Sequence, residues 1–92
     1  MSQQIEHQTE RLRFAIELEG ESAVLEYQRI SENRVDFKRT FVPERHRDRG
    51  IGGRLVRHAL EWARENDLKV VPSCSFVKSF ADDHPEFKDV VS

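Results

Sequence analysis

The stretch of sequence that decides the fold is a glycine-rich junction between a predicted strand and a predicted helix, Arg47-Asp48-Arg49-Gly50-Ile51-Gly52-Gly53-Arg54. Residues 35–42 before it alternate between apolar and polar side chains, which is typical of a half-buried strand. After it, apolar residues recur at helical spacing over residues 51–63. The junction therefore places a helix N-terminus, with free N–H groups and the positive end of the helix dipole, in a loop with few side chains. An anion such as a diphosphate fits this geometry.

The expected start of this helix has no capping side chain of its own. None of the usual N-cap residues immediately precedes the glycines, and Asp48, the nearest one, lies inside the loop. The first turn after Gly50 has no acidic residue, whereas Arg47, Arg49 and Arg54 surround it. This pattern favours binding of an external anion. A plain glycine-rich loop with a solvated basic cluster is the alternative explanation of the stretch in isolation.

The composition limits the class of protein. The chain has 92 residues, enough for one domain, and its 37% hydrophobic and 35% charged content is typical of a globular protein with a solvated surface. The net charge of −2 does not suit a general nucleic-acid coat. Cys74 is the only cysteine, which excludes an internal disulfide and a cysteine-based metal cage. The His, Asp and Glu residues lack metal-ligand spacing, so we predict no metal.

The sequence shows no targeting or membrane pattern. No apolar run approaches the roughly 20 residues that span a bilayer. Residues 1–6 have no apolar signal region. We therefore expect a reducing, cytoplasmic setting.

The N-terminal half predicts an antiparallel meander of three strands. Residues 1–10 are polar and are expected to be flexible, so the folded domain is expected over residues 11–92. Side chains alternate in the manner of half-buried strands over residues 11–18, 23–30 and 35–42. The turns between these strands are short and polar, which implies that neighbouring strands run antiparallel.

The C-terminal half predicts helices around one further strand. A helix over residues 51–65 has one broad apolar face, formed by Ile51, Leu55, Val56, Ala59, Leu60, Trp62 and Ala63. Residues 68–72 predict a short strand, which the helical crossover makes parallel to the third strand. A second helix, capped by Ser73 or Ser75, and a last helical piece from Pro85 follow. The predicted fold class is α+β in the order β-β-β-α-β-α, with a cleft beside the glycine-rich loop where the parallel strands diverge.

At this point the sequence resembles a known family. The run Val42-Pro43-Glu44-Arg45-His46-Arg47-Asp48-Arg49-Gly50-Ile51-Gly52-Gly53, before an amphipathic helix, resembles the acetyl-CoA signature of the GNAT N-acetyltransferase superfamily. That signature is Gln or Arg, two residues, Gly, one residue, and Gly or Ala, and Arg47, Gly50 and Gly52 fill it. Two further runs, VPSCSFV at residues 71–77 and HPEF at residues 84–87, resemble a subgroup of very short GNAT-like proteins. The resemblance covers residues 12–91 and implies a reduced GNAT-like fold.

The resemblance implies a cofactor and a reaction. In GNAT proteins the loop amides bind the pyrophosphate of acetyl-CoA, and the pantetheine arm lies between two splayed parallel strands. Carried over to this chain, the pyrophosphate donors are the amides of Arg47, Asp48, Arg49, Gly50, Ile51, Gly52 and Gly53, with Arg54 beside them. Phe41 and Val42 would contact the pantetheine through main-chain groups. The implied activity is transfer of an acetyl group from acetyl-CoA to an amine, which the sequence does not identify.

The chain departs from the full-length GNAT pattern at the catalytic groups. The turn at residues 19–22 leaves no room for the helices that help to build the acceptor site in full-length enzymes. Phe41 stands near the position where many of them carry a Glu base, and Phe80 stands where a tyrosine acid is common. A non-catalytic CoA-binding module is therefore a second interpretation. Contact between the basic residues 45–49 and nucleic-acid phosphates is a third.

Two side chains are the candidate catalytic residues. Cys74 lies between a predicted strand and a predicted helix start, where a thiol has a lowered pKa, so it could hold the acetyl group as a thioester before transfer. Alternatively, it is a small buried hydrophobe. His84 precedes a proline at a helix start and could act as a base near neutral pH, or pack the turn. We expect His46 and His58 to be solvated on the surface and His7 to lie in the flexible terminus.

Overall fold

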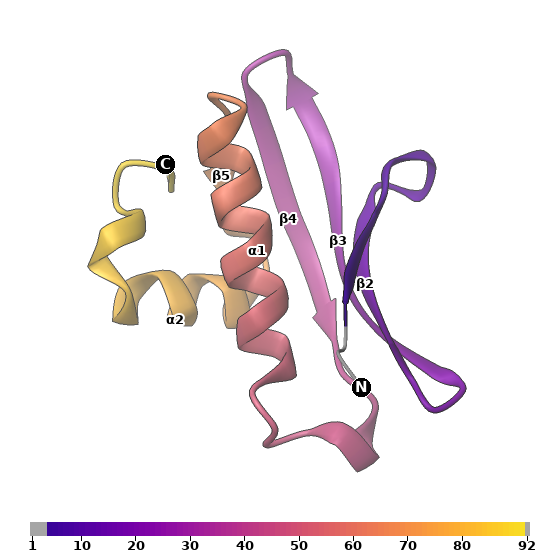
Figure 1. Cartoon of the computed structure of the whole chain (residues 1–92). Coiled ribbons are helices and arrows are strands. Elements are labelled where there is room, and N and C mark those ends of the chain that lie inside the picture. The colour runs from indigo at the N-terminus through magenta and orange to yellow at the C-terminus, as the bar shows by residue number, and fades with distance from the viewer. Residues whose placement is uncertain (1–3, 92) are drawn as a thin grey trace.

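A five-stranded mixed sheet carries one long helix across its face (Figure 1). The computed structural model describes residues 4–91. Its strands are β1 (Ile5–Gln8), β2 (Arg13–Leu18), β3 (Glu21–Ser31), β4 (Arg34–Phe41) and β5 (Lys69–Val71). Its helices are α1 (Ile51–Glu65) and α2 (Ser75–Asp83), with short 3-10 helices η1 (Thr9–Arg11), η2 (Glu44–His46) and η3 (Pro85–Phe87). The predicted α+β fold class is confirmed.

The sheet has the order β1-β2-β3-β4-β5, with antiparallel pairing up to β4 and a parallel pair at β4 and β5. The short turns explain the antiparallel part. Between β2 and β3 the chain reverses through Glu19 and Gly20, whose φ angles of 50° and 87° match the left-handed residues of a two-residue hairpin turn. The crossover through α1 explains the parallel pair, as the sequence predicted.

The sequence analysis missed β1, because it assigned residues 1–10 to a flexible terminus. Residues 5–8 pair antiparallel with β2, so the meander has four strands instead of three. Of the two inward positions on this strand, one is His7, which packs as an aromatic residue. Its ring stacks on Phe14 with 4.1 Å between centroids, and its Nε2 lies 2.6 Å from the hydroxyl of Tyr27. A histidine at a core position leaves no alternating apolar pattern in the sequence.

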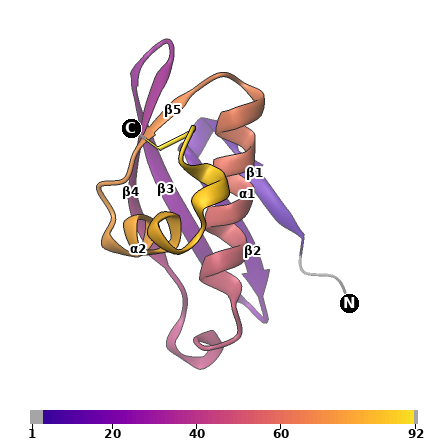
Figure 2. The same cartoon turned by 90° about the vertical axis from the view of Figure 1, so that its left-hand side faces the viewer.

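The core lies between α1 and the inner face of the sheet (Figures 1 and 2). The apolar face predicted for α1 is the face that is buried, except that Trp62 at its edge is half-buried. The largest fully buried side chains of the sheet opposite are Phe14, Ile16, Leu25, Val35, Phe37 and Val70. This packing fixes the N-terminus of α1 beside the C-terminal end of β4, because the two elements run in opposite directions along the core (Figure 1).

β4 and β5 part beyond a short paired segment. Their pairing ends at Asp36↔Val71, and the Cys74 amide then donates to the Phe37 carbonyl at 3.0 Å. β4 continues as far as Phe41, whereas the chain after β5 turns away into α2. The two chains therefore diverge next to the N-terminus of α1, as the α+β order predicted.

α2 is a surface helix that lies beside the start of α1 (Figure 2). Only Val77 of α2 is fully buried, while a Cβ atom added to Gly53 of α1 would lie 3.6 Å from the Phe80 ring. Among residues 4–91, neither helix has the length and apolar character that crossing a membrane requires.

Candidate functional site

The glycine-rich junction forms a loop that ends in an uncapped helix N-terminus. Gly50 is the N-cap of α1 and has a φ of 75°, in the left-handed region that favours glycine. Among the described residues, no side chain caps this end by a hydrogen bond, and the first turn contains no acidic residue. The predicted uncapped start of the helix is therefore confirmed. Its free amides and the helix dipole can bind an anion.

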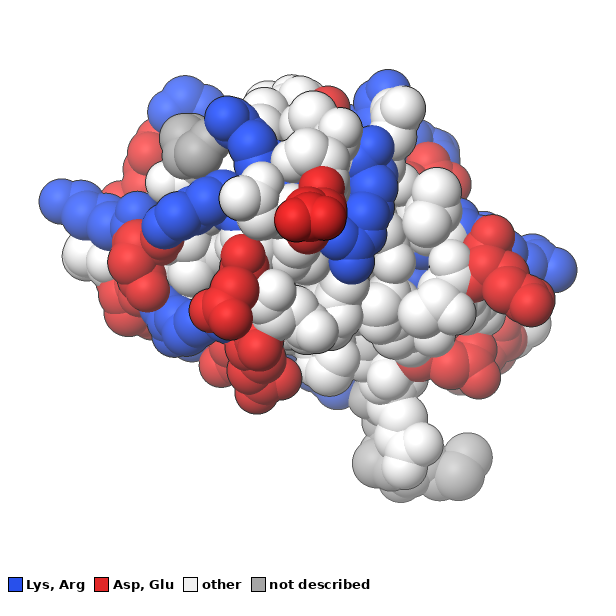
Figure 3. Space-filling model, turned by 90° about the horizontal axis from the view of Figure 1, so that it is seen from above, with Lys and Arg blue, Asp and Glu red and all other residues white. Residues whose placement is uncertain are grey.

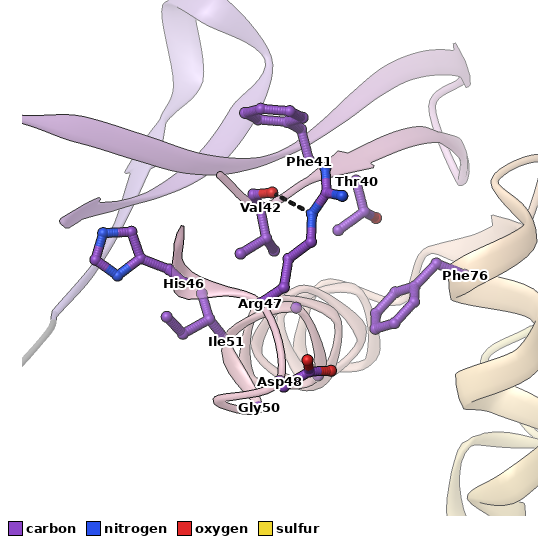
Figure 4. Close-up of a pocket in the computed structure, with 11 residues that line it drawn as sticks. Thr40, Phe41, Val42, His46, Arg47, Asp48, Gly50, Ile51 and Phe76 are labelled. Carbon is purple, nitrogen blue, oxygen red and sulfur yellow. Dashed lines mark hydrogen bonds between the residues drawn. The ribbon is translucent and has the colours of Figure 1, made fainter. Parts of the chain in front are cut away.

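A cleft of about 460 Å³ opens beside this helix end (Figure 4). The end of β4, the loop with the start of α1, and the start of α2 contribute to it. Its lining residues are Thr40, Phe41, Val42, His46, Arg47, Asp48, Gly50, Ile51, Gly52, Gly53 and Phe76. All residues that we predicted to bind acetyl-CoA lie here, except Arg49 and Arg54. The sequence analysis did not predict Thr40, His46 or Phe76 to line the cleft.

Two aromatic side chains form exposed apolar walls of the cleft. Phe41 is 37% exposed and Phe76 is 46% exposed. Figure 4 shows them on opposite sides, Phe41 from the end of β4 and Phe76 from α2. The cleft therefore combines apolar walls with a polar helix end, which suits a ligand that has both an anionic and an apolar part.

Arg47 reaches across the cleft to the strand end. Its Nε donates a hydrogen bond to the Val42 carbonyl at 3.0 Å, and its guanidinium lies beside Phe41 and Thr40 (Figure 4). Val42 lies one residue beyond the end of β4, so this carbonyl projects from the strand end at the cleft. Arg47 therefore ties the loop to β4 and places a positive charge inside the cleft.

His46 is buried against the β2–β3 turn, so the prediction that it is solvated was wrong. It is 3% exposed, and its Nε2 lies 3.7 Å from a carboxylate oxygen of Glu19 and 3.7 Å from one of Glu21. The neighbouring Arg45 donates two hydrogen bonds to Glu21, at 3.1 and 2.9 Å. These contacts hold η2 against the turn and thereby position the loop. A run of charged neighbours gave no sequence signal for this burial.

Cys74 does not line the cleft itself but contacts Thr40, which does. It is the N-cap of α2, a position that we had wrongly assigned to Ser73 or Ser75, and its Sγ lies 3.6 Å from the hydroxyl oxygen of Thr40. Partial burial by itself raises the pKa of Cys74. The Thr40 hydroxyl and the amides of Phe76 and Val77 outweigh that effect, so the pKa of the thiol lies below its ordinary value. Thr40 therefore links the thiol to the cleft.

His84 lies at the other end of α2 and packs there. It is the C-cap of the helix, its Nδ1 lies 2.7 Å from the Phe80 carbonyl, and its ring stacks on Phe80 with 3.9 Å between centroids. Cys74 and His84 thus flank a nine-residue helix, which separates them by about 15 Å at the usual rise per residue. The two predicted catalytic residues are not brought together, and the packing alternative describes His84 as it stands.

Comparison with known proteins assigns a family. The family model described as GCN5-related N-acetyl-transferase (GNAT) matches residues 13–90. The chain belongs to this family. Protein NATD1 of Gallus gallus is 34% identical over 84 residues, covering 89% of this chain and 76% of the relative. Protein NATD1 of Homo sapiens is 34% identical over 83 residues, covering 88% and 74%.

A solved GNAT-like structure supports the fold as well. A GCN5-like protein from Staphylococcus aureus, solved in solution by NMR and described as a candidate N-acetyltransferase, matches with a TM-score of 0.80 and 29% identity. The match covers 100% of this chain and 91% of that protein. The reduced GNAT-like fold that the resemblance implied is therefore confirmed for this chain.

The departures from the full-length GNAT pattern are visible in the structure. β2 connects directly to β3, so no helix stands between them. Phe41 ends β4 at the cleft, where the expected base is missing. Tyr27 lies under α1, where burial raises the pKa of its hydroxyl, and it does not line the cleft. Within residues 4–91, no group of three His, Cys, Asp or Glu side chains is arranged to hold a metal ion.

Proposed function

We propose that this GNAT chain binds acetyl-CoA in the cleft beside α1 and transfers its acetyl group to an amine. The observation that carries the proposal is the uncapped N-terminus of α1, with Gly50 in a left-handed conformation, at the edge of a cleft with aromatic walls. The pyrophosphate would lie on the amides of residues 47–53. The pantetheine would follow Phe41 and Val42 towards Thr40, and the binding domain includes β1 as well as the predicted part of the chain from residue 11 onward.

The proposed transfer uses Cys74 as the acceptor of the first step. Its thiolate attacks the thioester carbonyl, a new carbon–sulfur bond forms, and CoA leaves as a thiolate that takes up a proton. The amine then attacks the Cys74 thioester, loses a proton, and regenerates the Cys74 thiol. The lowered pKa of Cys74 and its contact with Thr40 support this assignment. A reducing cytoplasmic setting, which we also propose, would keep the thiol available.

The first experiment is calorimetric titration of the chain with acetyl-CoA, for which we expect 1:1 binding. Gly50→Ala should weaken binding, because a left-handed L-residue costs about 1–2 kcal/mol and the loop would leave its present conformation. Gly20→Ala is the matched control, since Gly20 also has a positive φ and nothing lies within 4 Å of an added Cβ atom at either site. Absence of CoA binding to the unmodified chain would overturn the proposal.

A non-catalytic CoA-binding module is the alternative function. The missing base, the missing acceptor-site helices and the position of Tyr27 away from the cleft favour it. Release of CoA thiol from acetyl-CoA in the presence of mixed primary amines distinguishes the two functions, since only the enzyme accelerates it. Nucleic-acid binding has less support, because the net charge is −2, Arg45 is paired with Glu21 and Arg47 donates to the Val42 carbonyl. At the opposite end of the molecule, Lys and Arg are interspersed with Asp and Glu (Figure 3).

A further inference from the structure

A groove of about 600 Å³ lies on the outer face of the sheet, the face that α1 does not cover (Figure 1). Glu26 and Gln28 of β3 line it, and they alternate with Leu25 and Tyr27, whose side chains are buried in the core. The residues that line the groove include Arg11, Leu12, Glu26, Gln28, Lys38 and Arg39. None of them lines the cleft beside α1, so the groove is a separate feature of the surface.

A β-bulge brings two cations together at this groove. Glu26 pairs with Arg39 and Tyr27 pairs with Phe37, so β4 has one residue, Lys38, more than β3 at this point. In a regular strand pair, Lys38 and Arg39 would point to opposite faces of the sheet, whereas here both line the groove. The bulge therefore places on the outer face a charge that a regular strand would direct towards the core.

The groove has an excess of positive charge. The Arg39 guanidinium forms an ion pair with Glu26, with 3.2 Å between nitrogen and oxygen. Lys38 donates to the amide oxygen of Gln28 at 3.1 Å, and this neutral partner leaves the charge of Lys38 uncompensated. The Arg11 guanidinium makes no hydrogen bond or ion pair within residues 4–91. Three cations and one carboxylate in the lining thus leave two positive charges without a partner of opposite sign.

One apolar side chain borders the same groove. Leu12 is 42% exposed and has a φ of 54°, in the left-handed region that leucine seldom adopts. Its amide donates to the Thr9 carbonyl at 3.2 Å, and its carbonyl accepts from the Tyr27 amide at 2.9 Å. The Tyr27 side chain is buried, so no aromatic ring among the described lining residues is open for stacking of a nucleic-acid base.

We propose that this groove is a second binding site of the chain and that it takes an acidic peptide segment with an apolar residue beside its carboxylates. The carboxylates match the uncompensated charges of Arg11 and Lys38, and the apolar residue packs on Leu12. A nucleic-acid strand fits less well, because Glu26 repels a continuous phosphate backbone and no exposed ring offers stacking. The site goes beyond the proposed function, since it requires neither acetyl-CoA nor Cys74.

The test uses two short peptides with blocked ends. One alternates glutamate with leucine, and the other has glutamine in place of every glutamate. Each is titrated into the protein without CoA at low salt, and dissociation constants come from the amide chemical shifts of Leu12, Gln28 and Arg39. We expect the glutamate peptide to bind roughly fivefold more tightly, the scale of two exposed ion pairs. This preference should disappear near 1 M salt, where the screening length falls to about 3 Å.

Charge variants locate the preference. Arg11→Gln/Lys38→Gln removes both uncompensated charges and should reduce the preference for glutamate to less than about twofold. Lys78→Gln/Lys88→Gln lowers the net charge by the same amount at positions that do not line the groove, and should retain the preference. Leu12→Asn should weaken both peptides alike, because asparagine tolerates a positive φ but offers no apolar contact. If the double variant at the groove does not fold, Arg11→Gln alone repeats the comparison.

Three results would overturn the proposal. The first is equal binding of the two peptides to the unmodified chain, or shifts confined to the cleft amides of Gly50 and Gly52. The second is an equal loss of preference in Lys78→Gln/Lys88→Gln, which would indicate an effect of net charge. The third is a short single-stranded oligonucleotide that shifts the groove amides and binds more tightly than the glutamate peptide. None of these results bears on binding of acetyl-CoA, which is measured separately.

Discussion

Phe76 packs over Gly52 so closely that a Cβ atom at Gly52 would lie 3.0 Å from the Cζ atom of the Phe76 ring. The contact joins the first turn of α1 to the first turn of α2, and both residues line the cleft. Packing against Phe76 therefore explains why a glycine occupies position 52. This explanation does not require a ligand that approaches the backbone.

We predict that Gly52→Ala changes ligand binding more than stability. Alanine favours a helix over glycine by about 1 kcal/mol, which offsets part of the cost of the tight contact. Phe76 is half exposed, so its ring can yield, but it then moves into the cleft. We expect the free energy of unfolding in urea to change by less than about 1 kcal/mol. Affinity for acetyl-CoA should fall several-fold in calorimetry.

A smaller side chain at position 76 provides the control. Phe76→Leu removes the ring that meets the new methyl group, so the double variant should recover much of the affinity that Gly52→Ala loses. Coupling of this sign is expected for residues in direct contact. If the two substitutions act additively on binding, Gly52 influences the ligand directly and Phe76 is not the intermediary.

The contact between Gly52 and Phe76 marks the boundary of what sequence could predict. The loop, the uncapped helix start and most cleft residues follow from local spacing, because they are consecutive in the chain and share one strand-to-helix junction. The sequence could not predict that Phe76 lines the cleft. This residue belongs to α2, and no local pattern in the sequence determines how α2 is oriented after β5. The periodicity of residues 75–81 predicted the helix but not which neighbour its exposed ring would meet.

Two histidines also show that contacts between residues distant in the sequence could not be predicted. We predicted His7 to lie in a flexible terminus and His46 to be solvated on the surface, whereas both are packed. Each has distant partners: Phe14 and Tyr27 for the first, and the β2–β3 turn for the second. A titratable ring can fill a core position only where the fold supplies such partners, and these are set by strand register.

We predict that His7 makes the free energy of unfolding depend on pH. Burial, and secondarily the charge of His58, lower the pKa of His7 below the ordinary value of 6.5. The unfolded chain therefore binds this proton more readily than the folded one, so the free energy of unfolding decreases as the pH falls through and below 6.5. Urea unfolding between pH 7.5 and pH 5, as a rough working range around the ordinary pKa of histidine, measures it.

His7→Phe is the matched variant for this dependence, because it retains an aromatic ring against Phe14 and removes the titrating group. The slope of stability against pH should be smaller in the variant than in the unmodified chain. The hydrogen bond to Tyr27 is lost at every pH, which lowers the whole curve without changing its slope. Two parallel curves would show that His7 does not titrate differently in the folded and unfolded states.

Arg49 should tune affinity through charge alone. It lies next to Gly50 at the end of the loop but outside the cleft lining. Arg49→Ala should weaken acetyl-CoA binding by roughly two- to threefold at low salt, as expected for a screened surface charge. The difference should vanish near 1 M salt, where the screening length falls to about 3 Å. Lys88→Ala removes an exposed charge away from the loop and serves as the control; an equal loss there would indicate an effect of net charge.

The last prediction concerns the thiol and its neighbour. Because the Thr40 hydroxyl is one of the groups that lower the pKa of Cys74, Thr40→Val should raise that pKa. Alkylation by iodoacetamide, followed against pH by intact-protein mass spectrometry, should reach half its maximal rate at higher pH in Thr40→Val than in the unmodified chain. Thr40→Ser retains the hydroxyl and should restore the original profile. An unchanged profile in Thr40→Val would mean that the main-chain groups of Phe76, Val77 and Thr40 lower the pKa of Cys74 without the Thr40 hydroxyl.

The same chains test whether the thiol carries the acetyl group. Incubation of the unmodified protein with acetyl-CoA should add one acetyl group that Cys74→Ala lacks, while calorimetry shows that Cys74→Ala still binds CoA. Transfer to amines should be largely lost in Cys74→Ala and not restored in Cys74→Ser, since a serine hydroxyl is far less ionised than a thiol near neutral pH. Thr40→Val should slow acetylation at neutral pH, because less thiolate is present. Normal transfer by Cys74→Ala without an acetylated intermediate would mean that Cys74 has only a packing role. The amine would then attack the thioester of acetyl-CoA directly.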